Sequence, residues 1–203
     1  MDEIKNNILW SKGSTGLKLM TKNYSSSSEF REWNPYKSEL AAALINGIEI
    51  FPIEKNSKVL YFDDNTESTL NHILDIIDLD GKIILISDEK SQKIHESKYQ
   101  KIPNIEIKFF SNDLNCEQSD ILYINSPEKN SLNLLQKLQS KLKKNGYFIL
   151  VLHTVEMNQD TSSDNINTYE KIKSLFDIIQ VVFLDSYFKN QTMIIGRKIS
   201  EIN

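Results

Sequence analysis

The stretch KVLYFDDNTESTLNHILDIIDLDGKIILIS, residues 58–87, contains the pattern that decides the fold. KVLYF (58–62) and KIILIS (82–87) are short and almost entirely apolar, which is typical of strands buried on both faces of a sheet. Between them, STLNHILDIID (68–78) has apolar residues at helical spacing. A buried strand, a helix and a second buried strand predict a parallel sheet covered by helices on both faces.

The same alternation continues toward the C-terminus. It predicts strands at 105–110, 120–125 and 147–154, and helices near 89–97 and at 129–144 and 168–179, the second ending at Gly146. The last two runs, VVFLDSY (181–187) and TMIIGRKI (192–199), are close enough to pair as an antiparallel hairpin. We expect an α/β protein with a parallel-dominated sheet of seven strands and an antiparallel last strand. This arrangement resembles the class I S-adenosylmethionine-methyltransferase-like (Rossmann-like) fold.

The residues before this pattern form a small segment of different character. Two apolar runs flank SKGSTG (11–16), whose glycines can adopt turn conformations, so a β-hairpin is expected. YSSSS (24–28) then indicates a flexible joint. We therefore expect a β-rich N-terminal segment over residues 1–29 and a methyltransferase-fold domain over residues 30–203.

Composition limits the class of protein. The chain has 203 residues, 39% hydrophobic and 26% charged, which is enough to bury one sizeable core. It has no apolar run near the ~18 residues of a membrane span, no secretory signal pattern, and a single cysteine, Cys116. We expect a soluble cytoplasmic protein. The net charge of −4, with only Arg31 and Arg197 as arginines, argues against a free-standing, high-affinity nucleic-acid binder.

The stretch FREWNPYKSELAAALINGI (30–48), which predicts a helix from about Lys37, resembles the signature of the fibrillarin family, the 2′-O-methyltransferases of box C/D RNA–protein particles. That signature has a Trp-Asn-Pro element, a basic-Ser-Lys-Leu step and a helix of small residues that ends in glycine. The matching residues are Trp33, Asn34, Pro35, Lys37, Ser38, Leu40, Ala42, Ala43 and Gly47. The similarity continues more loosely to about residue 199, and the N-terminal segment resembles that of archaeal members.

The resemblance implies a site for S-adenosylmethionine at the carboxyl ends of the first strands. Family members place glycines in the loop after the first strand, in a pattern like G-x-A-S-G-T-T. The corresponding positions here are Asp63, Asp64, Glu67, Ser68 and Thr69, with Asp63 and Glu67 at the two glycines. The acidic residue that should bind the ribose is replaced by Ser87. We therefore expect all six positions to be degenerate and no cofactor to bind, and we expect no metal site in this acidic loop.

The resemblance also implies a catalytic Lys-Asp-Lys-His set. The matching positions are Glu39, Asn125, His153 and Gln191. Asparagine and glutamine cannot act as general acids or bases near neutral pH, and glutamate in place of lysine reverses the local field. We therefore expect these positions to be degenerate, with no catalytic residue. His153 alone can titrate, but a hydrogen-bonded structural histidine is the preferred interpretation over a new active site.

The leading hypothesis is a fibrillarin-like pseudoenzyme, a non-catalytic binding or assembly component related to box C/D ribonucleoproteins. Its expected partners are a Nop-type scaffold protein or an active fibrillarin paralogue, with guide RNA in the complex and no membrane. The first alternative is an active RNA 2′-O-methyltransferase for rRNA or tRNA processing, with a remodelled S-adenosylmethionine site. The second is an interaction module unrelated to RNA. The lysines at 137, 141, 143 and 144 indicate the exposed face and end of a helix, with an RNA-phosphate patch as the alternative.

Overall fold

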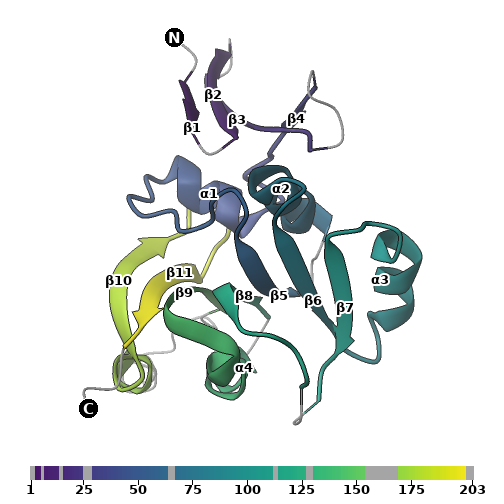
Figure 1. The fold of residues 1–203 in the computed structure, drawn as a ribbon. Helices are drawn as coiled ribbons and strands as arrows, with labels where there is room; N and C mark the ends of the chain where they lie inside the picture. The colour runs from purple at the N-terminus through teal and green to yellow at the C-terminus, as the bar shows by residue number, and fades with distance from the viewer. Residues whose placement is uncertain are drawn as a thin grey trace.

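The computed structural model describes residues 3–5, 7–13, 16–24, 29–63, 67–111, 114–126, 130–153 and 169–199. A seven-stranded sheet forms the centre of the molecule, and a four-stranded sheet lies at one end of it (Figure 1). No helix in the described part of the chain is long and apolar enough to cross a membrane.

The central sheet is mostly parallel. Its strands are β5 (Lys58–Asp63), β6 (Lys82–Ser87), β7 (Ile105–Phe109), β8 (Ser119–Asn125), β9 (Leu142–His153), β10 (Phe176–Phe183) and β11 (Gln191–Lys198). Their order is β10-β11-β9-β8-β5-β6-β7, and only β11 runs antiparallel to its neighbours β9 and β10. The expected fold class is confirmed. Because the chain proceeds from β5 outward on both sides, the switch point where α/β proteins bind ligands lies between the carboxyl ends of β5 and β8.

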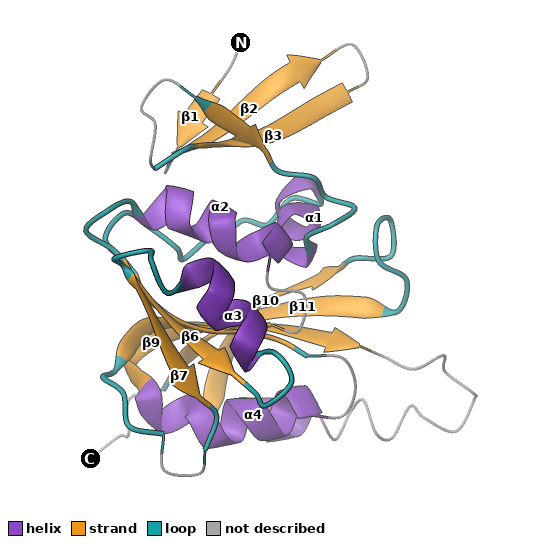
Figure 2. Cartoon of the chain, turned by 90° about the vertical axis from the view of Figure 1, so that its right-hand side faces the viewer, coloured by secondary structure: helices purple, strands orange, loops and turns teal. Residues whose placement is uncertain are grey.

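Helices cover the two faces of this sheet unequally (Figure 2). On one face lie α1 (Glu39–Ile45), α2 (Glu67–Ile77) and α3 (Gln92–Tyr99). On the other lie α4 (Asn130–Leu138) and the short 3₁₀-helix η1 (Gln139–Lys141). Alternation along β5 explains the division, because Val59 and Tyr61 pack toward α1 and α2 while Leu60 and Phe62 pack toward α4.

The small sheet is antiparallel and packs on α2. Its strands are β1 (Glu3–Lys5), β2 (Ile8–Gly13), β3 (Gly16–Lys22) and β4 (Phe30–Glu32), and the β2–β3 pair is the expected hairpin. The Thr21 hydroxyl of β3 joins the small sheet to α2, since it donates to Asp75 Oδ2 at 2.6 Å and lies 2.7 Å from His72 Nδ1. Trp33 stacks on the same His72 ring at 4.8 Å. The division after residue 29 stays a prediction.

Two predicted helices end earlier than expected. The helix predicted to residue 144 ends at Lys141 with η1, and β9 begins at Leu142, so Gly146 lies within a strand and not at a helix end. A Cβ at Gly146 would lie 2.9 Å from the Asp120 carbonyl oxygen, so glycine permits the close approach of β9 to β8. The helix predicted over 168–179 gives way to β10 at Phe176, whose ring is buried against Phe148 at 4.7 Å.

Candidate functional site

Five residues singled out from the sequence meet at the switch point. They are Glu39, Asp63, Asn125, His153 and Gln191, which come from the start of α1, the carboxyl ends of β5, β8 and β9, and the start of β11. Strand register brings them together, because Asp63 is paired with Asn125 and Gln191 with His153. The resemblance therefore identified residues that are distant in sequence and adjacent in space.

Asp63 is turned into the protein. Asp63 is only 4% exposed, and its carboxylate accepts hydrogen bonds from the Tyr61 hydroxyl at 2.6 Å and from the Asn125 amide at 3.2 Å. Tyr61 stacks face to face on Tyr123 of β8, with ring centroids 4.8 Å apart. Burial, and then the Asp63 charge, raise the pKa of Tyr61 well above its ordinary value, so this hydroxyl stays a donor.

Asn125 connects the other groups. Its side-chain oxygen lies 3.0 Å from His153 Nε2, and because an amide oxygen only accepts, His153 donates from Nε2. Its amide group also contacts the buried Glu39 carboxylate. Burial raises the pKa of Glu39, although hydrogen bonds from its own backbone N–H and from Asn125 oppose the shift. Burial lowers the pKa of His153, so its ring is neutral near pH 7.

Several buried polar atoms near this network lack a hydrogen-bond partner within the described residues. They are Tyr99 Oη, Tyr123 Oη and Gln191 Oε1. The Tyr123 ring is fully buried, and its hydroxyl lies close enough to Thr69, Asp63 and Glu39 for them to affect its pKa. Burial, followed by the charges of Glu67 and Asp63, raises the pKa of Tyr99 to about 12. These tyrosines are not among the residues predicted from the sequence. A signal for Tyr61 exists, since it precedes Asp63 by one strand period and so shares its face.

Ser87 and its neighbours form a local network of their own. Ser87 is fully buried, and its hydroxyl contacts Ser91 Oγ at 3.2 Å and His95 Nδ1 at 3.0 Å. The adjacent Asp88 carboxylate accepts from the Ser91 backbone N–H at 2.8 Å and from its hydroxyl at 2.5 Å. Asp88 therefore supports the start of α3, and Ser87 supplies a hydroxyl where the family has a carboxylate.

The remaining positions of the expected cofactor loop differ in their surroundings. Glu67 is exposed and pairs with Lys98 of α3. Thr69 is fully buried, and its hydroxyl lies 2.8 Å from Ser38 Oγ at the start of α1. Ser68 is half-buried next to them, and Asp64 lies outside the described residues. Within the described residues no cluster of His, Cys, Asp or Glu has the arrangement of a metal site.

Comparisons with known proteins point to one family. A family model described as "Fibrillarin" matches residues 5–200. The "Fibrillarin-like rRNA/tRNA 2'-O-methyltransferase" of Saccharolobus islandicus is 30% identical over 182 residues, which are 83% of this chain and 78% of that protein.

Two solved structures have the same fold. Aeropyrum pernix fibrillarin with natively bound S-adenosyl-L-methionine is 21% identical, with a TM-score of 0.78 over 94% of each chain. A fibrillarin/Nop5p complex contains a chain that is 19% identical, with a TM-score of 0.80 over 97% of this chain and 100% of that one.

Proposed function

Since the chain belongs to the fibrillarin family, we propose that it is a non-catalytic member that acts by binding within a box C/D-type RNA–protein particle. The observation that carries this proposal is the position of Asp63. At the first glycine position of the family's cofactor loop, a buried carboxylate is held by Tyr61 and Asn125. A side chain tied into the protein at this point leaves no bare backbone for a ligand to approach.

Two of the described residues argue against binding of S-adenosylmethionine. The cofactor's own carboxylate would approach Asp63, and a like-charge pair at ~4 Å costs about 4 kcal/mol at an effective dielectric near 20. The ribose hydroxyls would meet the Ser87 hydroxyl, which already contacts Ser91 and His95. The absence of cofactor binding is therefore part of the proposal.

Side chains at three of the four catalytic positions, Glu39, Asn125 and His153, contact one another. Asn125 contacts Asp63, Glu39 and His153, so its amide group is used by the protein. Glu39 has a raised pKa through burial and carries the opposite charge to the lysine expected there. Gln191 has no proton to exchange near neutral pH. General acid–base assistance contributes about 10²–10⁴-fold, so these changes support a chain without methyl-transfer activity.

A Nop-type scaffold is the protein partner that we propose. The fibrillarin/Nop5p complex contains a chain that this one matches along 97% of its length, which supports a shared mode of assembly. We also propose that guide RNA or an active paralogue is present in the same particle.

Calorimetry with S-adenosylmethionine and tritiated methyl transfer onto guided RNA test the proposal together. We expect a dissociation constant of about 1 mM or weaker. We also expect no transfer above background beside an active fibrillarin supplied with the same RNA and scaffold. A micromolar dissociation constant, or transfer by the purified wild-type chain, contradicts the proposal.

The second candidate function is an active RNA 2′-O-methyltransferase with a remodelled site. The arrangement of His153 favours it, because Nε2 donates to Asn125 and leaves Nδ1 of a neutral ring as a proton acceptor. The relative with natively bound S-adenosyl-L-methionine favours it as well. Methyl transfer by the wild-type chain that is lost in His153→Ala, while Lys143→Met retains it, would identify this function.

A further inference from the structure

Two aromatic and basic pairs that are far apart in the sequence lie side by side at the rim of the candidate site. One is Tyr36 with Lys37, just before α1, and the other is Tyr187 with Lys189, in the turn between β10 and β11. The Tyr36 ring meets the Tyr187 ring edge to face, with centroids 5.0 Å apart and planes at 68°. We call these four residues the tyrosine platform.

The backbone, and not burial of Tyr36, holds the platform in place. The Tyr36 N–H donates to the Asn34 side-chain oxygen at 2.8 Å, which closes a turn after the Trp-Asn-Pro element. The Tyr187 N–H donates to the Leu184 carbonyl at 2.8 Å, and the Leu184 N–H donates to the Gln191 carbonyl at 2.9 Å. These hydrogen bonds fix the backbone of both segments. Tyr187 is partly buried against the core, while Tyr36, Lys37 and Lys189 are exposed.

Most of the Tyr36 side chain lies outside the packed interior and faces solvent. It is 70% exposed, more than any other large hydrophobic side chain in the described part of the chain. An edge-to-face contact with Tyr187 steadies the ring and leaves most of its surface in water. Lys37 and Lys189 are also exposed, and within the described residues neither forms an ion pair.

The platform leads directly into the candidate site. Tyr36 shortly precedes Glu39 at the start of α1, and Tyr187 shortly precedes Gln191, which pairs with His153. Asn46, at the far end of α1, donates from its amide group to the Phe183 carbonyl at 2.9 Å, which links α1 to the end of β10. A ligand on Tyr36 would therefore lie close in the chain to residues of the candidate site.

We infer that the tyrosine platform binds an unpaired RNA base, which stacks on Tyr36 while Lys37 and Lys189 contact the neighbouring phosphates. An exposed aromatic face flanked by free ammonium groups is the arrangement that proteins use for single strands, because every base has a stacking face. Two lysines neutralise few phosphates, and the net charge of −4 adds no general attraction, so binding is weak without an assembly. This inference rests on the proposed function and names the RNA element that it binds.

The test is fluorescence anisotropy of the full chain with a fluorescein-labelled oligouridine at low salt. Loss of a stacked base costs about 1–3 kcal/mol, so Tyr36→Ala should weaken binding roughly tenfold. Tyr36→Phe keeps the ring and should bind as the wild type does. Phe109→Ala is the matched control, because Phe109 is also exposed, at 46%, but lies on the edge strand β7 away from the platform. Lys37→Ala with Lys189→Ala should lower the salt dependence, by about 0.7 in log–log slope for each phosphate that is no longer neutralised.

Three results with the oligouridine would overturn the inference. They are binding by the wild type weaker than about 10⁻⁴ M, unchanged binding by Tyr36→Ala, and equal losses in Tyr36→Ala and Phe109→Ala. If Tyr36→Ala weakens binding to a Nop-type scaffold and not to the oligouridine, the platform is a protein interface and the inference fails. Circular dichroism melting of each variant verifies folding. None of these measurements uses methyl transfer, so activity of the wild type would contradict the proposed function and leave the stacking result standing.

Discussion

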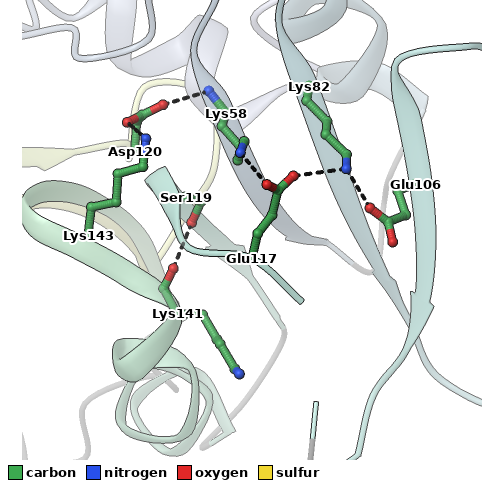
Figure 3. Close-up of polar contacts among 8 residues, drawn as sticks. All are labelled: Lys58, Lys82, Glu106, Glu117, Ser119, Asp120, Lys141 and Lys143. Atoms are coloured by element: carbon green, nitrogen blue, oxygen red, sulfur yellow. Dashed lines mark hydrogen bonds and ion pairs between the residues drawn. The ribbon is translucent and has the colours of Figure 1, made fainter. Parts of the chain in front are cut away.

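The two ends of the central sheet differ in how their acidic residues are placed. At the amino ends, an exposed chain of alternating ion pairs crosses three strands and the segment before β8 (Figure 3). Lys58 and Lys82 share Glu117, at 2.6 and 2.9 Å, and Lys82 also pairs with Glu106 at 2.6 Å. Each acid here has a basic partner, and both partners reach water. Exposed ion pairs of this kind cost little to form and contribute little to the free energy of unfolding.

At the carboxyl ends two acids are buried instead, although Glu67 there is exposed and pairs with Lys98. Glu39 and Asp63 are 5% and 4% exposed, and their described contacts are with amide and hydroxyl groups and not with lysines. Of the four buried side-chain polar atoms without a hydrogen-bond partner in the described part of the chain, those of Tyr99, Tyr123 and Gln191 lie at this end, and Asn104 Oδ1 lies at the other. Buried polar groups are expensive unless fully satisfied, so a fold keeps them where function requires them. The contrast supports the carboxyl edge as the candidate functional one even where its residues depart from the family's.

Removal of Asn125 should give the largest effect on stability, because it takes one hydrogen-bond partner away from each of two buried carboxylates and from His153. We expect Asn125→Ala to lower the free energy of unfolding by about 3 kcal/mol. Urea denaturation with an unchanged m-value measures this. The control is Asn104→Ala at the amino side of the sheet, where one hydrogen bond to the Asp78 carbonyl is removed, at about 1 kcal/mol. Equal losses in the two variants would remove the distinction between the ends.

The buried histidines and the amino-end ion pairs should lose their contributions to stability in different pH ranges. Burial lowers the pKa of His72 to about 3. This histidine therefore becomes protonated near pH 6.5 in the unfolded chain, but stays neutral in the folded chain until about pH 3. Stability therefore falls as the pH drops from 6.5 toward 3. We expect a loss of about 2 kcal/mol between pH 6.5 and 4.5, at roughly 1.4 kcal/mol per pH unit once His72 is charged in the unfolded state. Burial also lowers the pKa of His95 and His153, which add to the same loss.

The amino-end carboxylates act in a lower pH range. Their lysine partners hold the pKa of Glu117 at about 2 and that of Glu106 below its ordinary value, so their contribution is lost only below about pH 4.5. His72→Asn should flatten most of the slope above pH 4.5 and leave the lower range unchanged. Urea titrations at a series of pH values measure both. A slope above pH 4.5 that is unchanged in His72→Asn would show that His72 is not its main source.

Most of the fold could be predicted because its strands are uniformly apolar. KVLYF and KIILIS cannot be solvated on either face, and the structure has strands there. The errors arose where the local pattern permits two structures. KLQSKLKKNG suits a helix as well as a turn into β9, and the residues around Phe176 suit either state until burial against Phe148 selects a strand.

The resemblance predicted which residues lie in the candidate site, but it did not predict the hydrogen bonds between them. Resemblance located Glu39, Asn125 and His153, but their contacts depend on how β8 and β9 align with β5. The central position of Asn125 and the stacked Tyr61–Tyr123 pair follow from that register, which periodicity does not specify. Whether the four catalytic positions are inactive stays a prediction.

The smallest effect should come from the amino end itself. Lys143 pairs with Asp120 at 2.6 Å, yet the two side chains are 45% and 41% exposed. Water screens both charges, and the Lys58 backbone N–H still donates to Asp120 at 2.9 Å when the lysine is gone. We therefore expect Lys143→Met to change the free energy of unfolding by less than about 1 kcal/mol, and this difference should shrink further in high salt. Urea denaturation at two salt concentrations measures it. A loss as large as that of Asn125→Ala would mean that the exposed network stabilises the sheet as strongly as the buried one, and the comparison between the two ends would fail.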